Sequence, residues 1–288
     1  MNETLEILSL MRWPLLACLL LPWLLVYLGL HIVERQVIFV DLALAQIASL
    51  GSCLGLLCGY DPHDWQNYAL SLGFTFVGAV MLTFTRKLDH RVPQEALIGI
   101  LYVVAAAAGV LVLNRTTGGQ EELQRSLVGE LLTVTRREIL QTIALFALVG
   151  VVHFVFRRKF QAISLDPVKA AADGVSVIAW DFLFYILFGL VVTSFVHIGG
   201  VLLVFSYLII PAVCAVFLAK SFKMRFLVGW LVATLASGAS LVVTARKDLP
   251  LGAAIVCGLG ISLVLVMIYS ALRRRFAGAP ALDSTQGR

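Results

Sequence analysis

The sequence predicts an all-α polytopic membrane protein with about nine transmembrane helices. Its 288 residues are 60% hydrophobic and 14% charged, and the mean hydropathy is +0.95. Soluble proteins carry about 25% charged residues and need polar groups to cover their surface, so a soluble enzyme is excluded. Stretches free of Asp, Glu, Lys and Arg, long enough for a bilayer crossing of about 20 residues, recur along the whole chain.

Eight such apolar stretches define the expected spans. The stretch 182–219 would extend close to about 60 Å as one helix, whereas the hydrocarbon core is about 30 Å thick. The glycine pair Gly199-Gly200 is the natural position for a reversal, so we expect two spans there, at 178–196 and 201–219. The other spans are expected at 13–33, 42–60, 65–85, 96–114, 139–156, 226–245 and 249–272.

The basic residues predict which side of the membrane each loop occupies. One set of loops carries fifteen Lys and Arg residues, and the alternate set carries seven. By the positive-inside rule the first set is cytoplasmic, which places the amino terminus outside and the carboxyl terminus inside an inner (plasma) membrane. The first span lacks a basic leader and is too long for a signal-peptide core, so we expect it to be retained.

The chain is expected to form one transmembrane domain over residues 1–277, because no Pro- or Ser-rich linker divides it. Residues 278–288 are small and polar and are expected to form a disordered cytoplasmic tail. The basic residues lie between apolar segments rather than on one face, so the net charge of +5 does not indicate nucleic-acid binding. The five cysteines have no Cys-x-x-Cys spacing and are expected to be core residues.

The outer segment 121–138 is expected to form a short helix at the membrane interface, because it holds apolar residues at helical spacing. These residues are Leu127, Val128, Leu131 and Leu132. The outer turn with Asp61, His63 and Asp64 is expected to be a solvated turn, with a docking surface for a binding protein as the alternative.

The inner segment 157–175 predicts a short helix that Ser164 caps and Gly174 ends. Small residues such as Ala170 leave room for close contact, so the helix suits docking into the groove of a partner. From these residues alone, an ordinary basic loop remains an equal alternative.

Five pieces of sequence follow one another over most of the chain, from about Arg35 to the last span. They are Phe-Val-Asp-Leu-Ala-Leu-Ala-Gln at 39–46 with Gly51, Ala-Leu-Ile-Gly-Ile at 96–100, Leu-Val-Gly-Glu-Leu-Leu at 127–132, the spaced Ser164, Asp166, Ala170 and Gly174, and the stretch 200–212 from Gly-Val-Leu-Leu to Leu-Ile-Ile-Pro-Ala. In this order and at these distances, they resemble the membrane permeases of the ATP-binding-cassette metal importers, the zinc, manganese and iron uptake family.

The resemblance implies a permease subunit that alternates access for a divalent metal ion or a metal complex, driven by a separate ATPase. It implies that the segment with Ser164, Asp166, Ala170 and Gly174 is the coupling helix on a cytoplasmic ATP-binding-cassette ATPase. The implied partners are a second copy of the chain, an extracytoplasmic substrate-binding protein and the lipid bilayer. The chain has no Gly-x-x-x-x-Gly-Lys-Ser/Thr loop, so ATP is expected on the partner subunit, with no catalysis and no cofactor in this chain.

The second span departs from the family pattern. Family members typically have Asp and His four residues apart there, followed by a glycine five residues after the His. Here Gln46 takes the place of the His, five residues before Gly51, and Leu42 takes the place of the Asp. Asp41 points about 140° away from Gln46, because helical side chains rotate by about 100° per residue. An amide oxygen binds hard cations but is a poor zinc ligand.

The candidate residues of the substrate pathway are Asp41, Gln46 and His197, and Asp41 is the candidate metal ligand. Asp41 and Asp181 qualify because ionisable groups within a membrane are costly, although Asp181 is expected at interface depth. His197 lies beside the glycine break, and broken helices often line a path. His153 is expected to be a packed core histidine.

Two other classes of protein remain as alternatives. An ion- or proton-coupled secondary transporter is expected to carry ionisable relays in mid-membrane, and this chain has almost none. An intramembrane enzyme needs a pair of catalytic groups within reach of each other. Asp41 and Asp181 are the only acids within or beside the apolar runs, and the Gly-x-Gly at 258–260 is followed by Ile261 rather than Asp.

Overall fold

A computed structural model of the chain describes residues 2–62, 64–88, 92–116, 119–129, 131–247 and 249–276. The regular elements in these residues are helices, which confirms the predicted all-α fold. The predicted tail at 278–288 lies outside the described residues. The helices are α1 (Asn2–Arg35), α2 (Val40–Leu57), α3 (Trp65–Leu88), α4 (Gln94–Leu113), α5 (Gly119–Val128), η1 (Leu131–Thr133), α6 (Arg136–Val155), α7 (Arg157–Leu165), α8 (Pro167–Ala172), α9 (Val177–Leu218), α10 (Phe222–Lys247) and α11 (Leu251–Phe276).

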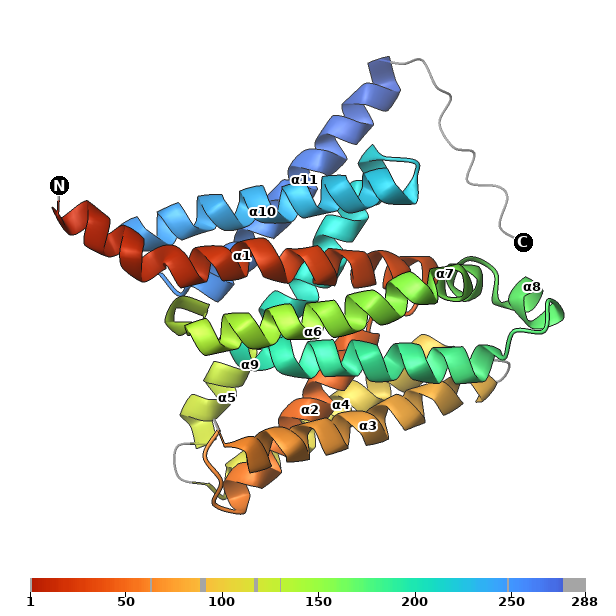
Figure 1. Cartoon of the computed structure of the whole chain (residues 1–288), viewed down its shortest axis with the longest axis horizontal. Coiled ribbons are helices and arrows are strands. Elements are labelled where there is room, and N and C mark those ends of the chain that lie inside the picture. Colours follow the sequence, from red (N-terminus) through yellow and green to blue (C-terminus); the bar gives the residue numbers. More distant parts are fainter. Residues whose placement is uncertain are drawn as a thin grey trace.

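Eight helices in this part of the chain are long and apolar enough to cross a membrane. One of them, α9, has 42 residues and is interrupted at Gly200, where φ is 74° and ψ is 164°. The chain reverses its direction at this point, so the two halves of α9 run as two separate spans (Figure 1). The reversal predicted at the glycine pair is therefore confirmed. It brings the described spans to about the nine crossings expected from the sequence.

Helix α9 forms the centre of the bundle and packs against α1, α2, α3, α10 and α11. It is apolar on all sides, as expected for a buried helix, and Phe184, Phe188 and Tyr207 are completely buried. A Cβ atom at Gly29 would lie 1.9 Å from the carbonyl oxygen of Leu208. Glycine at this position therefore permits the close approach of the α1 and α9 backbones, as small residues do in membrane bundles.

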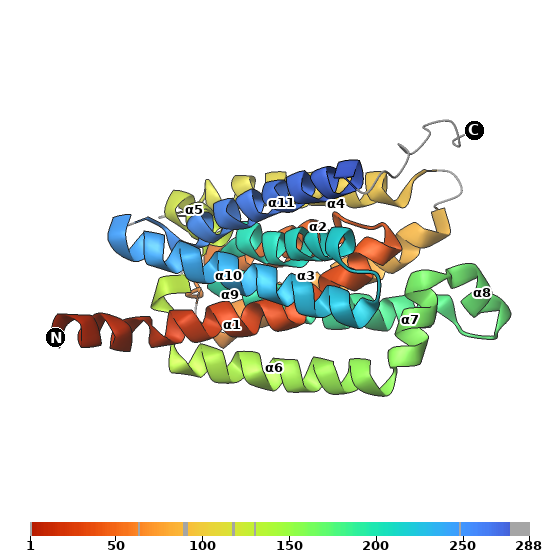
Figure 2. The same cartoon turned by 90° about the horizontal axis from the view of Figure 1, so that it is seen from above.

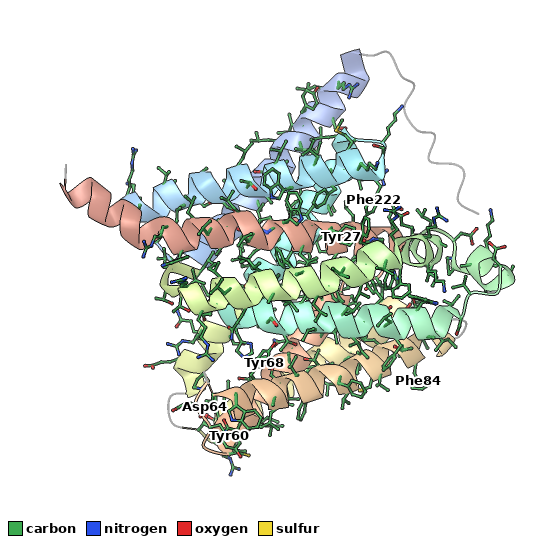
Figure 3. The ribbon with its side chains drawn as sticks, in the orientation of Figure 1. Tyr27, Tyr60, Asp64, Tyr68, Phe84 and Phe222 are labelled. Carbon is green, nitrogen blue, oxygen red and sulfur yellow. The ribbon has the colours of Figure 1, made fainter. Side chains whose placement is uncertain are left out.

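The segments that the sequence assigns to opposite sides of the membrane lie at opposite ends of the bundle. Helices α7 and α8 lie beyond one end, and α5 lies at the other (Figures 1 and 2). The turn between α2 and α3, with Tyr60 and Asp64, is also at the α5 end (Figure 3). Asp61 and Asp64 are exposed, in agreement with a solvated turn, whereas His63 lies outside the described residues. Which end faces the cytoplasm stays a prediction from the basic residues.

The outward faces of α4, α6 and α11 are apolar. Val104, Leu148 and Leu265 are each more than half exposed on these faces. A soluble protein would not expose so much apolar surface. Lipid, or a second copy of the chain, is therefore needed to cover it.

The interfacial helix expected at 121–138 forms only in its first part, as α5, and does not continue to residue 138. Helix α5 ends at Val128 because Gly129 adopts a positive φ of 72°. Helix α6 then starts separately, since Thr135 and Glu138 form a capping box at its N-terminus. The glycine turn between them packs against the break in α9, because a Cβ atom at Gly129 would lie only 2.1 Å from the carbonyl carbon of Gly199.

Candidate functional site

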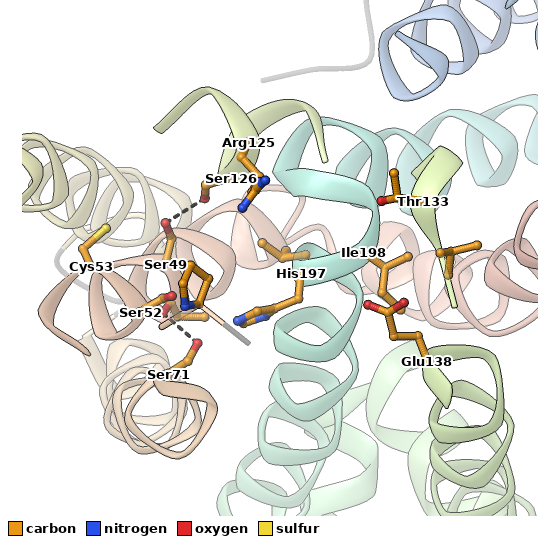
Figure 4. Close-up of a pocket in the computed structure, with 14 residues that line it drawn as sticks. Ser49, Ser52, Cys53, Ser71, Arg125, Ser126, Thr133, Glu138, His197 and Ile198 are labelled. Atoms are coloured by element: carbon orange, nitrogen blue, oxygen red, sulfur yellow. Dashed lines mark hydrogen bonds between the residues drawn. The ribbon is translucent and has the colours of Figure 1, made fainter. Parts of the chain in front are cut away.

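A polar pocket lies beside the break in α9, at the α5 end of the bundle (Figure 4). Its volume is about 90 Å³. At about 10 to 15 Å³ per water, this space holds several water molecules or a small hydrated ion. Its polar lining comes from α2, α3, α5, η1, α6 and α9: Ser49, Ser52, Ser71, Arg125, Ser126, Thr133, Glu138 and His197.

His197 is the imidazole of this pocket and lies three residues before the break at Gly200, and its role in a substrate path stays a prediction. Its Nδ1 atom lies 2.8 Å from the carbonyl oxygen of Thr193, one turn earlier in α9. A carbonyl only accepts, so Nδ1 donates and Nε2 is the acceptor nitrogen of the neutral ring, as in histidines that bind metals. The edge of Tyr68 contacts the ring, with the centroids 5.8 Å apart.

The hydroxyl groups of the pocket belong to short local networks. Ser49 and Ser126 hydrogen-bond to each other at 2.9 Å, and Ser71 donates to the carbonyl oxygen of Ala48 at 2.8 Å. Figure 4 shows His197 pointing toward Ser52 and Ser71. Among the described residues no group of three His, Cys, Asp or Glu side chains could hold a metal ion. The pocket therefore offers one imidazole, the carboxylate of Glu138, the guanidinium of Arg125 and several hydroxyl groups rather than a cage of strong ligands.

Asp41 and Gln46 do not line this pocket. Asp41 lies in the first turn of α2 and is only 1% exposed, and its Oδ1 accepts a hydrogen bond from the amide of Leu42 at 2.8 Å. A carboxylate at this position stabilises the start of a helix. Gln46 is partly buried one turn before Ser49, which does reach the pocket. Of the three predicted pathway residues, the structure places His197 in the pocket, and a metal at Asp41 stays a prediction.

The inner segment forms two short helices, α7 and α8, rather than one, and Ser164 does not cap either of them. Asp166 is the N-cap of α8, since its side chain accepts from the amide of Lys169 at 2.9 Å and Pro167 takes the first helical position. The predicted end at Gly174 is confirmed. Gly174 has a φ of 80°, and Val175 donates back to the carbonyl oxygen of Ala170 at 3.0 Å.

The faces of α7 and α8 differ sharply in exposure. Ala170 is only 3% exposed, so its methyl group packs within this chain and is not available to the groove of a partner, contrary to our expectation. Leu165 and Val168 are instead 69% and 79% exposed. The apolar surface at this end of the bundle is thus a different face of the predicted segment, which we call the docking face, with Leu165 and Val168 at its centre.

Asp181 is buried within the protein, and its depth in the membrane stays a prediction. It is fully buried near the start of α9 and forms an ion pair with Arg35 of α1, with Nη1 and Oδ1 2.8 Å apart. Ser164 of α7 joins this pair, because Arg35 Nε donates to Ser164 Oγ at 2.9 Å. His153 is 2% exposed and stacks on Phe160, which confirms that it is a packed core histidine.

Sequence reasoning missed two groups of residues. The serines of the pocket carry a weak signal, since Ser49 and Ser52 continue the polar face that Gln46 begins in an otherwise apolar span. Arg35 was counted as a loop charge, although it is buried. Without Arg35 the basic residues number fourteen against seven, so the predicted orientation does not change.

Comparisons with known proteins identify the family. The ABC 3 transport family model matches residues 8–270. An uncharacterized membrane protein of Synechocystis is 29% identical over 191 residues, which cover 65% of each chain. The manganese transport system membrane protein MntC of Halalkalibacterium halodurans is 26% identical over 210 residues, covering 70% of this chain and 72% of that protein.

The fold is also shared with a solved structure, PsaBC from Streptococcus pneumoniae in complex with Fab. The TM-score is 0.77 at 20% sequence identity, and the match covers 92% of this chain and 95% of that one. At this identity the likeness shows the fold alone. The family model spans nearly the whole chain, and the helices are those of a multi-pass membrane protein. The chain therefore belongs to the ABC 3 transport family.

Proposed function

We propose that this protein is the permease subunit of an ATP-driven importer for a divalent metal ion. Membership of the ABC 3 transport family over residues 8–270 is the observation that carries this proposal. The relative named as a manganese transport system membrane protein favours a metal as the substrate. The family also favours ATP as the energy source over the ion-coupled mechanism of a secondary transporter.

The docking face is the proposed contact with a cytoplasmic ATP-binding-cassette ATPase. Leu165 and Val168 are large apolar side chains at the very end of the bundle, where neither a span nor a described helix covers them. Exposed apolar side chains favour association with a partner, because binding removes their surface from water. The positive-inside count favours the cytoplasm for this end, which leaves the α5 end facing an extracytoplasmic substrate-binding protein.

The pocket beside His197 is the proposed position of the ion on the outer half of its path. One imidazole, the Glu138 carboxylate and the surrounding hydroxyls attract a hydrated cation, while the Arg125 guanidinium repels it. The resulting weak binding is what rapid release requires. Two copies of the permease are expected to complete the path, and the apolar faces of α4, α6 and α11 are candidates for their contact.

The proposal is tested by purifying the chain after co-expression with candidate ATP-binding-cassette ATPases. We expect a stable complex whose ATP hydrolysis increases when the permease is present. A chain that purifies without any ATPase, and that does not alter the hydrolysis rate of the added ATPase, would contradict the proposed function.

A further inference from the structure

Helix α7 is attached to the transmembrane bundle through a buried polar cluster. The cluster consists of His31 and Arg35 from α1, Ser164 from α7 and Asp181 from α9. The side chains of the Arg35–Asp181 pair are 4% and 1% exposed, and Ser164 is 4% exposed. Helix α1 and two helices that are far from it in the sequence, α7 and α9, therefore meet at one charged contact.

Ser164 connects the two sides of this cluster. Its Oγ atom accepts from Arg35 Nε at 2.9 Å and hydrogen-bonds to His31 Nδ1 at 3.1 Å. A serine hydroxyl has one proton and two lone pairs, so it serves both contacts at once. The Arg35 guanidinium also lies over the ring of Phe184 on α9, 3.9 Å from its centroid. This cation–π contact holds the guanidinium in place from another side.

A buried ion pair of this kind is an inefficient way to stabilise a fold. The cost of removing both charges from water often exceeds their attraction, and apolar side chains of similar size stabilise a fold equally well or better. What a buried, hydrogen-bonded pair does provide is one defined geometry between the elements that carry it. Here those elements are α1, α7 and the first half of α9.

The first half of α9 connects this cluster to the pocket. Asp181 lies near the start of α9, and His197 lies near the end of its first half, just before the break at Gly200. The fifteen residues between them have helical backbone angles, and the sixteen steps from Asp181 to His197 span about 24 Å at 1.5 Å per residue. Because this stretch is an unbroken helix, a displacement at Asp181 also moves His197.

We propose that Arg35, Ser164 and Asp181 form a coupling joint, which transmits movement of α7 and α8 to the first half of α9 and thereby to the pocket beside His197. This inference rests on the proposed function, in which an ATPase moves α7 and α8. The three residues act as positioning residues, since none of them lines the pocket.

The joint is tested with the complete permease–ATPase complex in lipid vesicles, by measuring Mn²⁺ imported per ATP hydrolysed. Asp181→Asn keeps the shape of the side chain and removes its charge. We expect this variant to hydrolyse ATP while importing about twofold to thirtyfold less Mn²⁺ per ATP, the range found when residues that couple two sites are changed. Ser164→Ala, which removes only the hydrogen bonds, is expected to change the ratio in the same direction.

A double variant separates coupling from stability. Arg35→Met with Asp181→Leu replaces the ion pair by apolar side chains. The melting temperature of this double variant is therefore expected to equal that of the wild-type complex. The import ratio is expected to remain low. Glu34→Gln is the matched control, because it breaks the more exposed Glu34–Arg225 pair between α1 and α10, and it is expected to leave the ratio unchanged.

Two results would overturn the joint. One is a wild-type ratio in both Asp181→Asn and Ser164→Ala. The other is a double variant that recovers the melting temperature and the ratio together, which would make the pair a purely structural contact. A wild-type complex that imports none of Mn²⁺, Zn²⁺ and Fe²⁺ with ATP would instead contradict the proposed function, so the two failures are distinguishable.

Discussion

Substitution by Arg is expected to lower stability at Ala170 and ATPase affinity at Val168, two nearby residues of α8. Ala170→Arg places a charge where only 3% of the residue is exposed, so we expect it to destabilise the protein by about 3 kcal/mol or more. Val168→Arg alters a side chain that is 79% exposed, and we expect an unchanged melting temperature with ATPase affinity lowered about thirtyfold. Melting curves and ATPase binding of both variants check this. Tight ATPase binding by Val168→Arg would show that the docking face lies elsewhere.

Asp41→Asn distinguishes a metal ligand from a helix-start residue. The carboxylate is buried at the start of α2 and does not line the pocket, so we expect Mn²⁺ uptake within about twofold of the wild-type rate. A loss of tenfold or more would establish Asp41 as part of the path.

Restoring the Asp and His pair of the family in the second span tests whether two ligands one turn apart create a zinc site there. Leu42→Asp with Gln46→His places a carboxylate and an imidazole one turn apart on the same helix face, so we expect measurable zinc binding by the double variant. Gln46→His alone lacks the second ligand, and calorimetry is expected to detect no tight site. Equal zinc affinity in the single and double variants would rule out a one-turn pair.

At the scale of elements, the glycine contact between α5 and α9 is expected to be intolerant of any side chain. Gly200 has a φ of 74°, and a Cβ atom there would lie 2.4 Å from the amide nitrogen of Gly129. Strain and overlap together are expected to cost Gly200→Ala about 3 kcal/mol or more, seen as a lower melting temperature. Gly238→Ala in α10 is the control, since nothing lies within 4 Å of the added atom. Equal melting temperatures for the two variants would contradict this role of the break.

Features of the helices that depend on the local sequence were predictable, whereas contacts between distant segments were not. The break in α9 was predictable because a single 38-residue apolar run cannot fit a bilayer, and the glycine pair marks the bend. The cap of α8 was also predictable from the sequence, since Asp166 followed by Pro167 is a stronger local helix-start pattern than Ser164. The packing of α5 on the break was not predictable, because it depends on a glycine turn meeting a distant glycine pair.

At the scale of the whole molecule, the candidate site was only partly predictable. His197 could be named because a local sequence break lies beside it. The Arg35–Asp181 pair could not, because each residue alone looks like a charge at the end of a span, and only the packed bundle brings them within 2.8 Å. Contacts between residues 146 positions apart are set by tertiary packing, for which a single sequence has no local signal.

The orientation of the molecule is open to direct labelling. In a background where the exposed Cys58 and Cys257 are replaced by serine, we expect Gly119→Cys to react with an impermeant thiol reagent from outside the cell. Lys169→Cys is expected to react only after the membrane is opened. The reverse pattern would place the docking face outside, where no ATPase could reach it.

The proposed function, import of a divalent metal ion at the expense of ATP, is tested most directly by uptake of Mn²⁺ into vesicles that hold the complete complex with its binding protein, with Zn²⁺ and Fe²⁺ measured in parallel. We expect accumulation of one of these ions with hydrolysable ATP and none with a non-hydrolysable analogue. Accumulation driven by a proton or sodium gradient without ATP, or no accumulation of any of the three ions, would contradict it.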